Sequence, residues 1–207
     1  MSSGERLGRQ DLTDIFTAFT AHENAVSFDA RLSTIFTDSA QGPAMLKLTS
    51  PDIHDGKTIP MKHVFKGMSC TGENVSPALS WSGAPAGTKS YAVTCHDPDA
   101  PTGSGWWHWV VYNIPANVTA LPQGAGDPKS GLMPKGAAQG KTDFGTAGYG
   151  GPCPPPGHGT HHYHFKVFAL DVDHLDIPDG GSPAMVGFNL HFHTLGNAEL
   201  VLSLIHI

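Results

Sequence analysis

The chain has 207 residues, enough for one domain with a sizeable core, or for one domain with an appendage. Its formal charge is −6 with histidines neutral, and Lys and Arg are nowhere gathered into a basic cluster, so nucleic acid is not expected as a partner. Only 14% of residues are charged, whereas Gly (25) and Pro (17) are abundant, which predicts short strands joined by many turns and a mostly β class.

The first 44 residues are interpreted as an N-terminal extension. Residues 11–20 follow Asp11, a suitable N-cap, and predict a short amphipathic helix with apolar residues at helical spacing: Leu12, Ile15, Phe16 and Phe19. This apolar face would pack on the domain or contact a protein partner or a second copy of the chain. Residues 37–44 are interpreted as a linker, and the main domain is expected over residues 45–207.

Six strand-like runs follow, each bounded by Gly, Pro, Asn or Asp: 45–50, 61–65, 77–81, 90–97, 106–114 and 161–172. Alternation within the fourth run predicts one face made of Tyr91, Val93, Cys95 and Asp97. Alternation within the fifth predicts one face made of His108, Val110, Tyr112 and Ile114. If these two runs pair, Asp97 at the end of one and His108 at the start of the other lie at the same sheet edge.

The rest of the chain is less regular. Residues 115–160 are rich in Gly and Pro, and a stretch of that length inside a domain is often functional. Its DFG sequence at 143–145 matches a kinase signature only in isolation and is interpreted as loop sequence. A helix is predicted from a cap at Ser182 to a stop at Gly196, followed by a last strand.

The three cysteines are Cys70, Cys95 and Cys153, an odd number with no CxxC pair, which predicts free thiols in a reducing compartment. The N-terminal sequence has no uninterrupted apolar h-region, and no later run reaches about 18 apolar residues. A cytoplasmic protein without a transmembrane segment is therefore predicted.

Histidine is abundant, with 13 residues. In the run GHGTHHYHF, strand alternation places His161 and Tyr163 on one face, and His162 and His164 on the other. Two imidazoles can donate hydrogen bonds to an anionic oxygen, and a carboxylate on the far ring nitrogen fixes the tautomer. The candidates for one such site are Asp97, Asp99, His108 and His161.

This cluster suits phosphate, and its carboxylates also suit the ammonium group of a zwitterionic headgroup. Binding is expected to strengthen as pH falls through the histidine range, because protonated His108 and His161 would attract the anion. The same four side chains are also adequate zinc ligands, so a metal-dependent hydrolase is the alternative. No HExxH motif ties them together, and His191-x-His193 falls in the predicted helix.

Four blocks of sequence occur in an order typical of one family: GENVSPALSW, SYAVTCHDPDAPTGSGWWHWVVYNIP, TDFGTAGYGGPCPPPGHGTHHYHF and AMVGFNLHFHTL. Over about residues 45–202 the chain resembles the phosphatidylethanolamine-binding protein family, in its prokaryotic Raf-kinase-inhibitor-like branch. The resemblance implies a β-sandwich with a large central antiparallel sheet, a smaller sheet and peripheral helices. It also implies a non-enzymatic binding protein that modulates a kinase or another protein, with no cofactor and no metal.

The resemblance further implies a small anion pocket at one end of the sheet, formed by Asp97, Asp99, His108, His161 and Tyr163. Two departures stand out. His162 occupies a position where the family usually has arginine, so bidentate bonding at this position is lost. The chain ends in SLIHI, which resembles translated adaptor sequence, so the end after about residue 202 is interpreted as truncated or artefactual.

Overall fold

The computed structural model describes residues 45–206, so the helix and linker predicted for residues 1–44 lie outside the described residues. The elements in chain order are β1 Lys47–Thr49, the 3-10 turn η1 Met61–His63, β2 Lys66–Gly67, β3 Cys70–Thr71, β4 Leu79–Ser82, β5 Ser90–Asp97, β6 Trp106–Pro115, β7 Ala120–Leu121, β8 Ala138–Gln139, β9 Thr160–Leu170, α1 Pro183–His193 and β10 Thr194–Ile205.

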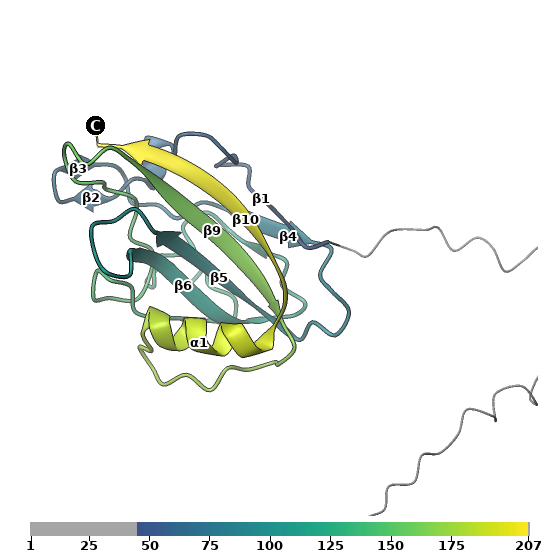
Figure 1. Ribbon diagram of the computed structural model, residues 1–207. Helices are drawn as coiled ribbons and strands as arrows, with labels where there is room; N and C mark the ends of the chain where they lie inside the picture. The colour runs from purple at the N-terminus through teal and green to yellow at the C-terminus, as the bar shows by residue number, and fades with distance from the viewer. Residues whose placement is uncertain (1–44, 207) are drawn as a thin grey trace, which may run out of the picture. The chain divides into compact units, whose positions relative to one another are not determined.

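The large sheet is antiparallel and has the strand order β10-β9-β5-β6-β8 (Figure 1). β5 and β6 are long runs of aromatic and branched residues with few breakers, a composition that favours strands buried on both faces, whereas β9 alternates buried with more exposed residues. β5 lies between β9 and β6, and seven of its eight residues are buried. This central position brings the ends of three strands together at one edge of the molecule.

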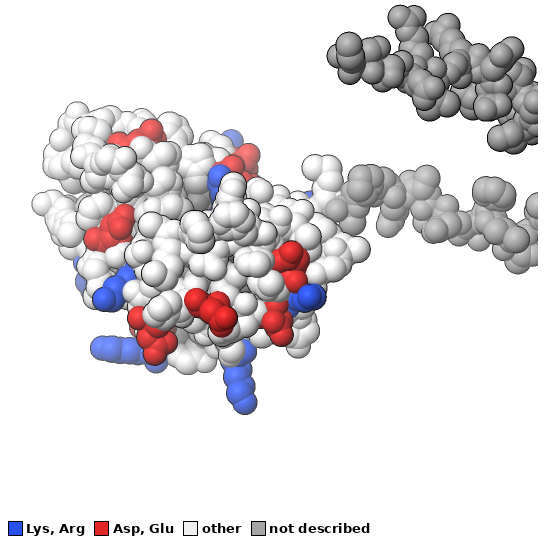
Figure 2. Space-filling view, turned by 60° about the horizontal axis from the view of Figure 1, so that its bottom comes forward, with Lys and Arg blue, Asp and Glu red and all other residues white. Residues whose placement is uncertain are grey.

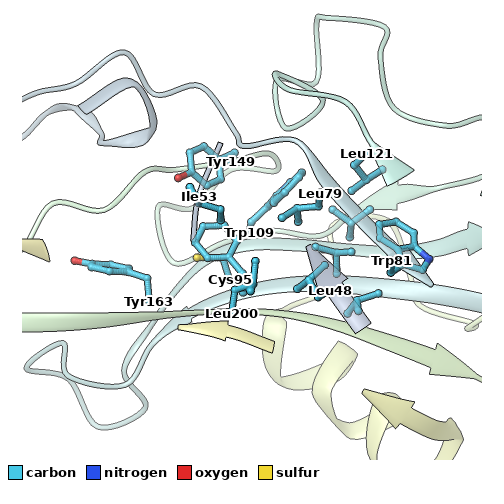
Figure 3. Packing of buried hydrophobic residues seen from close by; sticks show 14 of the residues in the cluster. Leu48, Ile53, Leu79, Trp81, Cys95, Trp109, Leu121, Tyr149, Tyr163 and Leu200 are labelled. Atoms are coloured by element: carbon cyan, nitrogen blue, oxygen red, sulfur yellow. The ribbon is translucent and has the colours of Figure 1, made fainter. Parts of the chain in front are cut away.

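The smaller sheet, β1-β4-β7, contributes Leu48, Leu79, Trp81 and Leu121 to the same hydrophobic core as the inner face of the large sheet. Figure 3 shows these side chains in one cluster with Trp109 and Cys95 from the large sheet. A mostly β fold with a large antiparallel sheet packed on a smaller one is therefore confirmed, and β2 and β3 form a separate two-stranded hairpin. Burial of this many large apolar side chains is the main source of stability in such a fold.

α1 covers the outer face of the large sheet, where Val186 and Leu190 pack against Val110 and Tyr112 of β6. The helix begins after Ser182, whose side-chain oxygen accepts a hydrogen bond from the Met185 backbone N–H, as an N-cap does. The predicted cap is confirmed. The helix ends three residues before the predicted stop at Gly196, because β10 begins at Thr194.

Gly187 lies within α1, where a Cβ atom would meet nothing within 4 Å. Replacing Gly187 with alanine is expected to raise the free energy of unfolding by about 0.5–1 kcal/mol, because alanine loses less backbone entropy on forming a helix. Urea unfolding measures the gain. Gly151→Ala is the contrasting control, since its Cβ would lie 2.3 Å from the His63 carbonyl oxygen and should destabilise the fold. No gain for Gly187→Ala would contradict the prediction.

Two β-bulges in β6 change the face on which its side chains lie. Cys95 pairs with Trp109 and His96 with Trp107, so His108 is an extra residue between two pairs. His108 consequently turns to the core side, where its ring contacts Tyr163. The predicted face of His108, Val110, Tyr112 and Ile114 is therefore wrong: Val110 and Tyr112 face α1, and Ile114 lies in the core after a second bulge.

The alternation predicted for β5 is confirmed, since Tyr91, Val93 and Cys95 all lie in the main core. The strand predicted over 61–65 is wrong, because Pro60 precedes the 3-10 turn η1 and His63 N–H bonds back to the Pro60 carbonyl. No helix within residues 45–206 has the length and apolar character needed to span a bilayer.

Residues 55–59 lie along the free edge of β10. Gly56 N–H donates to the Val201 carbonyl at 2.8 Å, and Ile59 N–H donates to the Ser203 carbonyl at 3.0 Å. Ser203 N–H in turn donates to the Lys57 carbonyl at 3.1 Å. β10 pairs with β9 as far as Ile205, and Leu204 lies opposite His161. Residues 203–205 therefore belong to the strand that pairs with β9 at His161.

Cys70 and Cys153 form a disulfide, with 6.0 Å between their Cα atoms. The prediction of three free thiols is therefore wrong, and only Cys95 is free and buried. The two partners are 83 residues apart, and the bond ties the β2–β3 hairpin to the irregular segment before β9. An odd cysteine count did not indicate which pair, if any, would meet.

Candidate functional site

The candidate site lies where β5 ends beside β9 and β6. The Asp97 carboxylate accepts a hydrogen bond from His161 Nδ1 at 2.7 Å, and both side chains are almost fully buried, with residue exposures of 3% and 1%. The sequence placed Asp97 and His161 among the same candidates, and strand pairing brings them into contact. A carboxylate that accepts the Nδ1 proton fixes the tautomer and the ring orientation of the histidine.

The other oxygen of Asp97 shapes the loop that follows β5. It accepts hydrogen bonds from the backbone N–H groups of Asp99 (2.9 Å) and Ala100 (3.1 Å), an Asx-type turn. Gly105 closes the loop at φ +72°, where a Cβ would lie 2.4 Å from the Asp97 carbonyl oxygen. Asp97 therefore holds both the loop and the histidine.

His108 lies on the core side of β6 because of the first bulge. Its Nδ1 lies 2.7 Å from the Gly150 carbonyl oxygen and must carry a proton to donate to it. Burial lowers the pKa of His108 to about 4, although the bond to Gly150 and the charge of Asp97 act in the opposite direction. Near neutral pH His108 is therefore uncharged, and its Nε2 is a hydrogen-bond acceptor.

This state of His108 changes the expected pH dependence of binding. Protonated His108 does not contribute to anion attraction between pH 5 and 8, because its pKa lies below that range. A ligand atom facing His108 Nε2 must instead supply a proton, as a P–OH group does.

Tyr163 follows His161 by two residues on β9 and faces the core with it, as predicted. Its ring meets His108 edge to face with centroids 5.2 Å apart. The Tyr163 hydroxyl is buried and has no hydrogen-bond partner among the described residues. Burial, together with the negative charge of Asp97, raises the pKa of Tyr163 well above its ordinary value, so the hydroxyl stays protonated. In Figure 3 this hydroxyl points away from the centre of the core cluster.

Asp99 does not line the cavity at this site. Its carboxylate accepts hydrogen bonds from the His162 backbone N–H at 2.8 Å and from His162 Nδ1 at 2.7 Å, and both side chains are about half exposed. Partial burial acts to raise the pKa of Asp99, but these hydrogen bonds outweigh it, and the pKa is lowered from its ordinary value. His162, at the position where the family usually has arginine, thus holds the Asp99 carboxylate outside the cavity.

A cavity of about 210 Å³ opens at this edge of the sheet. Three of the predicted site residues line it: Asp97, His108 and His161. The other wall residues are mostly apolar and come from four separate loops and strands: Met68, Ala100, Pro101, Thr102, Trp106, Phe144, Cys153 and Pro155.

Phe144 belongs to the DFG sequence that was interpreted as plain loop. Its ring stacks on Phe65 with centroids 4.7 Å apart and meets Trp106 edge to face at 5.4 Å. Trp107 of β6 holds Asp143, the residue before Phe144, because the Trp107 backbone N–H donates to the Asp143 carboxylate at 2.8 Å. The sequence feature that could have indicated the position of Phe144 is Gly150, where a Cβ would lie 2.4 Å from the Phe144 ring. A glycine there is needed for the ring to lie against the backbone.

His161 has a second partner at its other ring nitrogen. His161 Nε2 lies 2.9 Å from Nδ1 of His158, an exposed residue in the loop before β9. Both ring nitrogens of His161 are therefore engaged. Within residues 45–206, no group of three or more His, Cys, Asp or Glu side chains is arranged to hold a metal ion.

Charges are sparse on the surface. On the face shown in Figure 2, the lysine side chains are few and Asp and Glu side chains lie among them, so this face presents no extended basic patch. The sequence likewise has only 12 Lys and Arg against 18 Asp and Glu. On this face the charges therefore do not combine into a strong field of one sign.

An antiparallel β-sandwich with a small pocket at one sheet edge defines the class of protein. The model of the family described as phosphatidylethanolamine-binding protein matches residues 49–204, and the chain belongs to that family. It is 57% identical over 157 residues to the UPF0098 protein YbhB of Escherichia coli, covering 75% of this chain and 97% of YbhB.

Two solved structures are similar across most of the chain. The crystal structure of E. coli YbcL, described as a member of the mammalian PEBP family, aligns with a TM-score of 0.76 at 50% identity, covering 79% of this chain and 99% of YbcL. The homologue CT736 of Chlamydia trachomatis aligns with a TM-score of 0.66 at 32% identity, covering 79% and 99%.

Proposed function

We propose that the protein is a non-enzymatic binding protein whose end cavity takes a small phosphate-bearing ligand, such as a phospholipid headgroup or a phosphorylated metabolite. The observation that carries the proposal is the buried Asp97–His161 pair on the wall of a small cavity. With Nδ1 donating to Asp97, a protonated His161 can direct Nε2–H to a ligand oxygen, and the carboxylate stabilises the charge on the ring.

The cavity wall supports a ligand that both accepts and donates hydrogen bonds. Neutral His108 offers an acceptor nitrogen, which suits the P–OH of a singly ionised phosphate. A fully ionised oxyanion without such a proton would meet the lone pair of His108 and be disfavoured. The proposal therefore favours phosphate and its monoesters over sulfate, which carries no proton near neutral pH.

The size and lining of the cavity support a headgroup-sized ligand. A volume of about 210 Å³ is below the roughly 300–1,000 Å³ typical of pockets for drug-sized molecules. Trp106 on its wall offers an aromatic face to an ammonium group, such as that of an ethanolamine headgroup. A free phosphorylated amine offers both a P–OH and an ammonium group, whereas a lipid headgroup is a phosphodiester without a P–OH and offers only its ammonium N–H groups to His108 Nε2.

Calorimetric titration tests the proposal. Inorganic phosphate and O-phosphorylethanolamine are titrated into the wild-type protein, His161→Ala and His164→Ala. His164 is the matched control, because it lies on the same strand but on the opposite face from His161. We expect wild-type binding that weakens at least tenfold in His161→Ala and is unchanged in His164→Ala, since a charge-assisted hydrogen bond contributes about 1.5–3 kcal/mol.

Absence of binding by the wild-type protein would sink the proposal. So would equal affinity of the wild type and His161→Ala. Phosphatidylethanolamine vesicles, used in a parallel flotation assay, distinguish a lipid source of the headgroup from a free metabolite. Stoichiometric zinc in the same purified sample would instead favour the metal-dependent hydrolase.

The disulfide bears on where the protein works. Disulfides persist in oxidising compartments and are rare in the cytoplasm. The cytoplasmic location predicted from three free thiols loses that support, because Cys70 and Cys153 are paired. We therefore infer that the protein works in a compartment that does not reduce this bond. The modulation of a kinase implied by the resemblance stays a prediction.

A further inference from the structure

We infer that His158 is a built-in competitor for the anion-binding nitrogen of His161, so that the ligand must displace His158 to bind. The inference rests on the proposed phosphate site and adds to it the residue that controls access.

The geometry places His158 on the one nitrogen that a ligand needs. His161 Nδ1 is held by Asp97 at 2.7 Å, so Nε2 alone remains for a ligand, and it lies 2.9 Å from His158 Nδ1. The two imidazole rings cross at 66° with centroids 5.1 Å apart. While this contact lasts, His161 has no nitrogen to offer to an oxyanion.

The positions of the protons on His161 and His158 explain why the His158–His161 hydrogen bond and a bound oxyanion exclude each other. A neutral His161 that donates Nδ1–H to Asp97 keeps a lone pair on Nε2 and accepts a hydrogen bond from His158 Nδ1–H. An oxyanion needs the opposite arrangement, with a proton on Nε2. That proton comes from solvent or from a P–OH of the ligand, and His158 must turn away because one Nε2–H cannot serve both acceptors at full strength.

The loop around His158 is suited to such a movement. His158 is exposed, whereas His161 is buried, so the His158 ring can exchange its partner for water. Gly157 and Gly159 flank it at φ +75° and +94°, and a Cβ at either would meet nothing within 4 Å. Pro155, three residues earlier, lines the cavity and accepts a backbone hydrogen bond from His158 N–H at 3.2 Å.

Other charged or titratable groups near His161 do not replace this contact. Asp97 on β5 is occupied by His161 and by the backbone of its own loop. His108 on β6 is held by Gly150, and Asp99 is held by His162 outside the cavity. His158 is therefore the group whose position decides whether His161 Nε2 is free.

The test is phosphate titration of the wild type, His158→Ala and His158→Asn. Removing the competing hydrogen bond should tighten phosphate binding by roughly two- to tenfold in His158→Ala. His158→Asn should behave like the wild type, because the amide nitrogen of asparagine can occupy the place of His158 Nδ1 and donate to His161. Thermal unfolding of each variant verifies the fold, which an exposed loop position should leave intact.

Weaker or unchanged phosphate binding in His158→Ala, alongside measurable wild-type binding, would overturn the inference while leaving the proposed function in place. Weaker binding would show that His158 holds the ligand and does not compete with it. If neither the wild type nor His158→Ala binds phosphate or O-phosphorylethanolamine, the proposed function itself fails and the inference fails with it.

Discussion

Replacing Cys70 and Cys153 together with serine is expected to lower the free energy of unfolding by about 4 kcal/mol. The bond closes a loop across 83 residues, and a cross-link of that span removes much of the conformational entropy of the unfolded chain. Urea unfolding at fixed pH measures the loss. The effect is a large part of the 5–15 kcal/mol that is typical for the whole stability of a domain.

The control for this prediction is reduction. A dithiol reductant converts the disulfide to two thiols and is itself oxidised to a disulfide. It should destabilise the wild type by a similar amount and leave the double variant unchanged. Cys95 is the remaining cysteine and is buried, so it does not react readily in the folded protein. A double variant as stable as the wild type would contradict the role assigned to the bond.

Acidification from about pH 6.5 to about 4 is expected to cost about 3 kcal/mol through His108 alone. Burial lowers the pKa of His108 to about 4 in the folded protein, whereas an unfolded histidine titrates near 6.5. Between these two values the unfolded chain binds a proton that the folded protein does not bind. Stability therefore falls as pH falls through this window, and the contribution levels off below about pH 4.

Comparison with His108→Asn isolates this effect from other titrating groups. Asparagine can still donate its amide N–H to the Gly150 carbonyl but does not titrate, so the slope of stability against pH should be shallower in the variant. Urea midpoints at several pH values between 7 and 4 give both slopes. Equal slopes would mean that His108 is not held neutral by burial.

The sequence predicted the parts of the site that depend on regular strands. Alternation in β5 correctly placed Asp97 on the core side, and alternation in β9 correctly separated His161 and Tyr163 from His162. These predictions held because β5 and β9 pair in continuous register from Ser90 to His96. A period of two is reliable only where no residue is inserted.

The sequence could not predict the part that depends on a bulge. Counting by twos placed His108 with Val110, but the extra residue opposite Cys95 and His96 turns His108 to the core. The inserted residue leaves no mark in the alternation of a strand that is buried on both faces. His108 reached the candidate list through its position beside Asp97, although its predicted face was wrong.

The loop residues that line the cavity also could not be predicted from sequence periodicity. Phe144 and Cys153 come from the irregular stretch between residues 115 and 160, where side chains are placed by contacts distant in sequence. The disulfide partner of Cys153 precedes it by 83 residues. Such pairings follow from the finished topology, which spacing alone does not determine.

The segment 55–59, which lies along β10, has a consequence for assembly. An uncovered outer strand presents unpaired N–H and C=O groups, which another chain can use to extend the sheet. Here Gly56 and Ile59 already occupy that hydrogen-bonding edge at Val201 and Ser203. At the opposite edge, β8 is only two residues long and offers little template. The end of β10 near Val201 and Ser203 is therefore protected against growth of the sheet by strand addition.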